Sequence, residues 1–221
     1  MFFNELGYEL INDFISHDEL TAVIDETESA LHTEKGGGIR NAEKKFASVL
    51  ELTQSPQIIK HAGKFLTNQP ALVRAILFDK RPEKNWLVTW HQDKSIALSN
   101  RFNKSGWGPW SMKDGIHNVQ PPQEVLEQMI TFRIHLDEST AKSGCLKLLP
   151  KTHSLGILSQ KQISQYANTH SAKIIEAPAR SALAMRPLIL HASSKAEVPT
   201  MRRVLHLEYS DFELPVGVSW A

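Results

Sequence analysis

The sequence predicts a mainly β protein, a sandwich or barrel of the jelly-roll kind with helices packed outside it. Two observations lead to this fold class. The long helical patterns lie in the first third of the chain, and from about residue 71 onward short apolar or alternating runs are separated by turn-forming residues. The expected strands span residues 71–78, 86–90, 129–136, 145–149, 181–190 and 202–209.

Two helices are expected before the strands. The first covers residues 16–33, where Ser16 opens a capping-box pattern and apolar residues recur at helical spacing. Three glycines at 36–38 interrupt this pattern, because glycine weakens a helix. The second helix is expected at 55–66, with Pro56 in its first turn.

Later in the chain, only residues 123–129 and 160–167 indicate short helices. No internal repeat or low-complexity tract interrupts the sequence. We therefore expect a single domain over residues 1–221, with a helical support at 1–70 and a jelly-roll core at 71–212.

Composition and charge exclude several classes of partner. The 25 Lys and Arg side chains against 24 Asp and Glu leave a formal net charge of +1, so no broad basic field exists for nucleic acid or an anionic membrane. No apolar run approaches the roughly 20 residues that cross a bilayer. The single cysteine, Cys145, cannot form an internal disulfide and is expected in the core, and the N-terminal residues do not resemble a secretory signal. We expect a cytoplasmic monomer or homodimer whose partner is a small molecule.

The segment at 99–122 is long and rich in Gly, Pro and Trp. Two interpretations remain open, a lid or binding loop over a site and a surface excursion held down by its tryptophans. Two interpretations also remain open for Arg40, which follows the three glycines: a cation over the mouth of a site, and a solvated side chain. Trp86 and Trp90 are expected in the core. The candidate substrate contacts in the long segment are Asn100, Arg101, Trp107, Trp110 and Lys113.

Five His-x-Asp/Glu pairs are candidate metal-binding motifs. On a strand, residues i and i+2 share a face and can reach one ion, whereas on a helix they point about 200° apart. This excludes the two pairs at the ends of the first helix, and residue pattern alone does not rank the other three. The excluded pairs are His17/Glu19 and His32/Glu34, and the remaining pairs are His91/Asp93, His135/Asp137 and His206/Glu208.

Five features in order resemble the phytanoyl-CoA dioxygenase family of Fe(II)- and 2-oxoglutarate-dependent oxygenases. Residues 90–93 read Trp-His-Gln-Asp, residues 143–146 read Ser-Gly-Cys-Leu, and residues 150–153 read Pro-Lys-Thr-His. His191 and then Arg202 follow at the family's spacing. One departure is Lys-Thr where Gly-Ser is usual before the turn histidine, and it affects only the local turn.

The resemblance implies a double-stranded β-helix, a cupin-like jelly roll, whose facial triad of His91, Asp93 and His191 binds Fe(II) and leaves three positions for 2-oxoglutarate and O2. It also implies that Arg202 binds the far carboxylate of 2-oxoglutarate, with a hydroxyl donor from Ser193. Arg203 is the alternative, because alternation places the two arginines on opposite faces of one strand. We expect Arg202 to face inward.

The implied reaction is hydroxylation or another C–H oxidation of a small or carrier-tethered substrate, with release of succinate and CO2. Halogenating relatives lack the carboxylate that Asp93 supplies, so halogenation is not expected. A non-catalytic metal-containing binding module and a cupin-type metalloenzyme that does not use 2-oxoglutarate remain alternatives. His135 and Asp137 are expected to be structural and are the reserve ligands, and His153 is expected to hold a turn.

Overall fold

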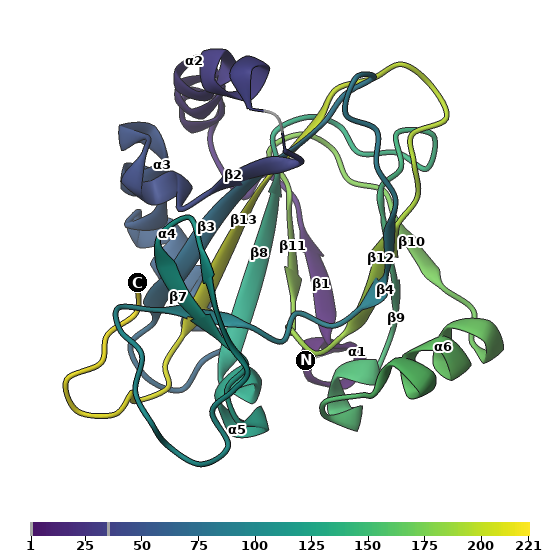
Figure 1. Ribbon diagram of the computed structural model, residues 1–221. Coiled ribbons are helices and arrows are strands. Elements are labelled where there is room, and N and C mark those ends of the chain that lie inside the picture. The colour runs from purple at the N-terminus through teal and green to yellow at the C-terminus, as the bar shows by residue number, and fades with distance from the viewer. Residues whose placement is uncertain (1, 35) are drawn as a thin grey trace.

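The computed structural model describes residues 2–34 and 36–221. Two β-sheets face each other, as expected for a jelly roll (Figure 1). Side chains from both sheets line a cavity between them. The six-stranded sheet has the order β1 (Tyr8–Ile11), β11 (Ala182–Met185), β8 (Met129–His135), β13 (Arg202–Ser210), β3 (Ala71–Lys80) and β2 (Gly38–Arg40). The four-stranded sheet has the order β10 (Lys173–Ile175), β9 (Leu146–Leu149), β12 (Leu190–Ser193) and β4 (Val88–His91).

The apolar core lies on the outer face of the six-stranded sheet. Leu205 and Leu207 of β13 and Phe132 of β8 point to this face, where helices cover them (Figure 1). Buried apolar side chains of this kind supply most of the stability of a domain. On the opposite face of the same two strands, Arg133, Arg202, His206 and Glu208 line the cavity. The helices are α1 (Phe2–Leu6), α2 (His17–Thr33), α3 (Ala47–Thr53), α4 (Pro56–Ala62), α5 (Gln123–Glu127) and α6 (Gln160–Thr169), with 3-10 turns η1 (Ala42–Lys44) and η2 (Thr152–Leu155).

Helix α2 begins where the sequence predicts. The Ser16 hydroxyl accepts a hydrogen bond from the Glu19 backbone N–H at 3.1 Å, and the Glu19 carboxylate accepts one from the Ser16 N–H at 2.7 Å. This capping box satisfies two N–H groups that the helix leaves unpaired. The Glu26 carboxylate then accepts hydrogen bonds from the first two N–H groups of α3, which joins the two helices.

Two differences from the expected strands have a clear physical reason. The apolar run at 181–190 is divided between β11 and β12, and residues 186–189 form the turn that carries the chain from one sheet to the other. Most of this turn is buried, so the run looks continuous in the sequence, although Arg186 and Pro187 mark the break. The first 70 residues are not wholly helical, because the short strands β1 and β2 join the edges of the six-stranded sheet.

The segment at 99–122 is not an irregular loop throughout. Its second half is a hairpin of β6 (Trp110–Lys113) and β7 (Ile116–Val119), which pairs with β5 (Ile96–Leu98) in a three-stranded sheet. The hairpin turns at Asp114 and Gly115, both at positive φ, where Asp and Gly are favoured. Among the described residues, no helix has the length and apolar character that crossing a bilayer requires.

Candidate active site

His91 and His191 face each other across the pairing of β4 with β12. They are direct partners in this antiparallel pair, and their ring centroids lie 4.2 Å apart. Each Nδ1 lies within hydrogen-bond distance of the carbonyl oxygen two residues earlier, Thr89 at 2.8 Å and Ile189 at 2.9 Å. A carbonyl only accepts, so both Nδ1 atoms carry the proton and both Nε2 atoms keep a free lone pair.

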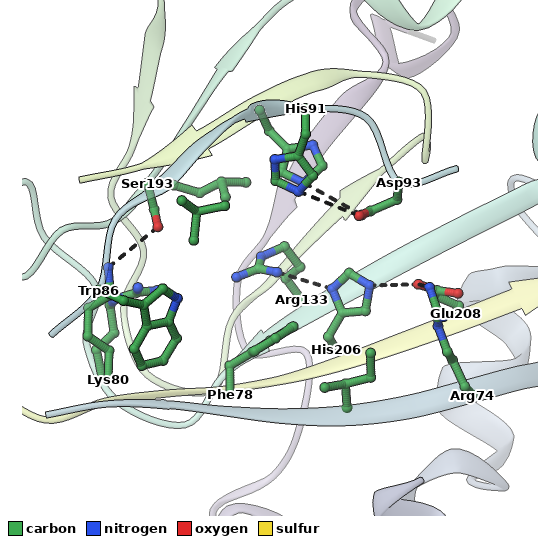
Figure 2. Close-up of a pocket in the computed structure, with 15 residues that line it drawn as sticks. Arg74, Phe78, Lys80, Trp86, His91, Asp93, Arg133, Ser193, His206 and Glu208 are labelled. Carbon is green, nitrogen blue, oxygen red and sulfur yellow. Dashed lines mark hydrogen bonds and ion pairs between the residues drawn. The ribbon is translucent and has the colours of Figure 1, made fainter. Parts of the chain in front are cut away.

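Asp93 completes the group just after β4 (Figure 2). Its backbone N–H donates to the Pro187 carbonyl at 2.9 Å, which places the carboxylate beside the two imidazoles. Asp93 Oδ1 lies 3.7 Å from His91 Nε2, and Oδ2 lies 3.5 Å from His191 Nε2. The three ligand atoms lie within 4.8 Å of one another, and none of the described residues donates a hydrogen bond to Asp93 Oδ2. Three lone-pair donors without a proton donor fit a divalent cation.

The protonation states of this group also suit a metal ion. Burial lowers the pKa of His191 to about 4, so the imidazole is neutral at pH 7. Burial works against ionisation of Asp93, but the neighbouring histidines, His191 first, and the Arg74 guanidinium outweigh it and hold the pKa of this carboxyl well below its usual value. Metal ligation needs a neutral imidazole and an ionised carboxylate.

A cavity of about 180 Å³ extends from this group toward Lys80, Ser193 and Arg202. The Arg202 Nε donates to the Ser143 carbonyl at 3.2 Å, and Lys80 Nζ donates to the Ser194 carbonyl at 2.7 Å and lies 3.5 Å from Ser193 Oγ. Burial and the nearby Arg202 lower the pKa of Lys80 to about 8. Two buried cations thus lie at one end of the cavity without an ion-pair partner among the described carboxylates.

Arg203 lies on the opposite face of β13. Its guanidinium donates to both carboxylate oxygens of Asp137, at 2.9 and 2.7 Å, and to Glu28 at 2.6 Å. This arrangement leaves Arg202 as the arginine of the pair that lines the cavity. The reserve ligands His135 and Asp137 do not form a site together. The Asp137 carboxylate is paired with Arg203, and the His135 side chain is buried in the six-stranded sheet.

The cavity floor contains a chain of hydrogen bonds that residue pattern did not bring together (Figure 2). Arg133 of β8 donates to His206 Nδ1 at 3.1 Å, and His206 Nε2 donates to Glu208 at 3.0 Å. Arg74 of β3 donates to the same Glu208 oxygen at 2.8 Å. A second group of possible metal ligands contains Asp93, His206 and Glu208. Both ring nitrogens of His206, however, already form hydrogen bonds within the protein. The group with His91 and His191 is therefore the better metal site.

The candidate substrate contacts separate into two sets. Asn100 and Arg101 are exposed, while Trp107 is buried and Trp110 partly buried around Phe102, at 4.9 and 5.3 Å between ring centroids. None of these four candidates lines the cavity or the groove beside it. Lys113, at the end of β6, does line the groove.

The structure also places the other residues that the sequence singled out. Trp86, expected in the core, lines the cavity instead, with Lys80 Nζ 5.4 Å from the centre of its ring. Trp90 packs against a small apolar cluster, and Cys145 is buried. His153 Nε2 lies 3.2 Å from the Asn4 carbonyl, so this histidine joins the η2 turn to the N-terminal segment.

A candidate metal site of two histidines and one aspartate inside a jelly roll is typical of cupin-like metalloproteins, and the sequence comparison gives the family. Residues 3–204 match the model of the phytanoyl-CoA dioxygenase (PhyH) family, and the chain belongs to this family. No curated protein matches the chain.

Several solved structures share the fold. AviO1 from Streptomyces viridochromogenes Tue57 has a TM-score of 0.72 at 17% identity, over 96% of this chain and 93% of that one. SnoK, a non-heme alpha ketoglutarate dependent carbocyclase from nogalamycin biosynthesis, has a TM-score of 0.72 at 15% identity, over 95% and 81%. HygX from Streptomyces hygroscopicus, with nickel and 2-oxoglutarate bound, has a TM-score of 0.67 at 10% identity, over 94% and 83%. The predicted jelly-roll fold is confirmed.

Proposed function

We propose that this protein is an Fe(II)- and 2-oxoglutarate-dependent dioxygenase that oxidises a C–H bond of a small substrate. The main supporting observation is that two imidazole lone pairs and one ionised carboxylate converge on one point. Two buried cations line the same cavity, and neither has an ion-pair partner among the described carboxylates. Family membership supports the proposal, as does the fold shared with SnoK and HygX, whose names describe 2-oxoglutarate dependence or binding.

His91, Asp93 and His191 are the proposed iron ligands. Three protein ligands leave three positions open, whereas a structural site usually closes with four. When bound, the iron supplies activation of O2, with oxidation of 2-oxoglutarate to succinate and CO2 and transfer of one oxygen atom to the substrate. The Nδ1 hydrogen bonds to Thr89 and Ile189 fix the ring orientations, so the protein holds the ligands aligned before the metal arrives.

Arg202 and Ser193 are the proposed partners of the far carboxylate of 2-oxoglutarate. Arg202 remains charged at all physiological pH values and meets a carboxylate bidentately. Lys80 adds a second cation at the same end, because it is the direct strand partner of Arg202 and contacts Ser193. A dianionic cosubstrate with one end at the metal and the other at these cations places a carboxylate beside each positive group.

Within this class, hydroxylation is the proposed reaction. Asp93 supplies the carboxylate at the metal site, so no position is vacated there for a halide. The alternatives are a metal-containing binding module and a metalloenzyme that does not use 2-oxoglutarate. The first predicts no turnover, and the second predicts oxygen consumption without succinate.

One experiment separates these functions. Fe(II) and 2-oxoglutarate are added without oxygen, the weak visible charge-transfer band is recorded, and oxygen is then admitted while succinate is measured. We expect the band and a slow release of succinate, which a panel of small metabolites stimulates when it contains the substrate. Asp93→Ala should lose both signals, and His17→Gln, an exposed histidine in the same His-x-acid motif, should keep both. Absence of succinate from the wild type contradicts the proposal.

A further inference from the structure

We propose that the primary substrate carries an oxyanion, a carboxylate or a phosphate, and that Arg40 and Lys113 bind it in a groove beside the metal site. This inference rests on the proposed function and adds the chemical class of the substrate.

The groove adjoins the metal-site cavity directly. It has a volume of about 490 Å³, and Arg74, Trp86 and Asp93 line both spaces. A molecule whose anionic group lies beside Arg40 and Lys113 can therefore extend past these shared residues toward the proposed iron. This continuity makes the groove the route by which a substrate reaches the metal.

The glycine run positions Arg40. A Cβ on Gly38 would lie 2.4 Å from the Leu77 carbonyl oxygen, and one on Gly37 would lie 3.1 Å from the Trp86 ring. At Gly38 only glycine allows the chain to lie this close to β3, and at Gly37 a larger residue would require the Trp86 ring to shift. Strand β2 then pairs with β3, with Arg40 opposite Ile76, a residue that lines both the cavity and the groove.

The tight hairpin positions Lys113 from the other side. Lys113 is the last residue of β6, directly before the turn at Asp114 and Gly115. The hairpin thus ends at the groove, and in Figure 1 its turn lies near β2. Two segments more than 70 residues apart in sequence bring one cation each to the same space.

Charge around the groove is not balanced. Burial lowers the pKa of Lys113, and the cations Arg74 and Arg40 lower it further. The charged groups that act most strongly on this ammonium are therefore positive. Arg74 is neutralised by Glu208, while Arg40 and Lys113 form no ion pair with a carboxylate of the described residues. The groove also contains Glu34, whose carboxylate accepts a hydrogen bond from Gly36 N–H, and Asp114 at the hairpin turn.

The charge count over both spaces leads to the class of substrate. Among the described residues, six Lys and Arg side chains and four carboxylates line the cavity and the groove together, which leaves two positive charges. A divalent cation and a doubly ionised 2-oxoglutarate cancel each other and leave this excess unchanged. Unpaired cations in a partly enclosed space attract an anion and raise its local concentration. A carboxylate or a phosphate on the substrate supplies the missing negative charge.

The test measures anion binding without turnover. The protein is loaded with Zn(II) and 2-oxoglutarate, which are diamagnetic and do not react, and amide NMR shifts are followed at constant ionic strength. Acetate and inorganic phosphate are the probes, and acetamide is the uncharged control. We expect saturable shifts at residues 36–40 and 110–116 with one or both anions and none with acetamide. Which anion binds more tightly distinguishes a carboxylate substrate from a phosphate substrate.

Variants then assign the binding to the two cations. Arg40→Gln together with Lys113→Gln should raise the dissociation constant about tenfold or more. Lys161→Gln, which removes an exposed cation on α6, should leave it unchanged. The inference is wrong if neither anion gives saturable shifts in the groove, if acetamide gives the same shifts, or if the double variant binds as the wild type does.

The same spectra separate this result from the proposed function. Binding of 2-oxoglutarate is reported by amides near Ser193 and Arg202, at the other end of the cavity. Loss of those shifts with intact anion binding in the groove would contradict the oxygenase proposal alone. Intact 2-oxoglutarate binding and succinate release without anion binding in the groove would contradict the substrate class alone.

Discussion

His91 and His191 are one hundred positions apart in the chain and are direct partners in the ladder between β4 and β12. The backbone hydrogen bonds of two adjacent strands therefore set the separation of the two imidazoles. Each ring is further fixed by an Nδ1 hydrogen bond to the carbonyl oxygen two residues earlier in the chain. The proposed metal site is therefore built by strand pairing, and of its three residues only Asp93 lies outside the paired positions.

The first prediction concerns metal binding and stability. A ligand that binds only the folded state, at a free concentration 100 times its dissociation constant, raises the free energy of unfolding by about 2.7 kcal/mol. Fe(II) added under argon should raise the melting temperature of the wild type and of His17→Gln, measured by differential scanning fluorimetry. His191→Ala removes one of three ligands and should abolish the rise. A full rise in His191→Ala would show that the metal binds elsewhere.

The second prediction distinguishes the two neighbouring arginines. Arg202→Ala should weaken 2-oxoglutarate binding by at least about 2 kcal/mol, roughly 30-fold, because a buried carboxylate loses its paired cation. Arg203→Ala should leave the affinity unchanged and lower the free energy of unfolding, because Asp137 and Glu28 lose their partner. Isothermal titration and urea unfolding measure the two effects. The reverse pattern would overturn the assignment of Arg202.

The third prediction concerns pH and His135. Burial lowers the pKa of His135 to about 3, and neither ring nitrogen has a hydrogen-bond partner among the described residues. Its value in the unfolded chain is about 6.5. The unfolded state thus binds the extra proton, and stability is present above pH 6.5 and is lost as the pH falls toward 3.

In urea unfolding of the metal-free protein between pH 5.5 and 4.5, His135→Leu should therefore show a weaker pH dependence than the wild type. The difference should be about 1.4 kcal/mol per pH unit, the contribution of one proton. His191, whose pKa is also lowered, keeps part of the slope in both proteins. Identical slopes would show that His135 is not held neutral by burial.

The fourth prediction concerns Gly144, in the Ser-Gly-Cys-Leu motif. Its φ is +69°, and an added Cβ would lie 2.5 Å from the Ser194 carbonyl oxygen, next to Ser193. Gly144→Ala should lower the free energy of unfolding by about 2 kcal/mol or more and weaken 2-oxoglutarate binding. Gly217→Ala is the control, because φ is +80° there but nothing lies within 4 Å, so only the backbone cost of about 1 kcal/mol remains. Equal losses in the two variants would exclude the steric explanation.

Part of the fold follows from local pattern. The capping box marks the start of α2, and alternation along β13 separates Arg202 from Arg203, because one face of that strand is apolar and packed against helices. The hairpin at 110–119 carried a signal that could have been read, since Asp114-Gly115 is a favoured two-residue turn. The tryptophans nearby directed attention to a binding loop, although Trp107 is a core residue.

The polar floor of the cavity could not be predicted in the same way. Arg74 and Arg133 lie within strands that read as apolar, and their partners His206 and Glu208 are on β13, far along the chain. Sequence spacing does not report which inward positions of different strands meet. The sequence does indicate Arg40 and Lys113 as candidate contacts, but it does not show that β2 and the hairpin bring both side chains to one groove.

The placement of the apolar core outside the barrel has a consequence for how such proteins diverge. Much of the apolar packing lies between the helices and the outer sheet face, so substitutions at exposed positions of the groove can alter binding at little cost to folding. A groove residue such as Lys113 can be exchanged in this way, whereas loss of Arg74 would leave the Glu208 carboxylate buried without its cation. Residues that bind ligands can therefore change while the packed framework is kept, which fits the low sequence identity at which these structures still superimpose.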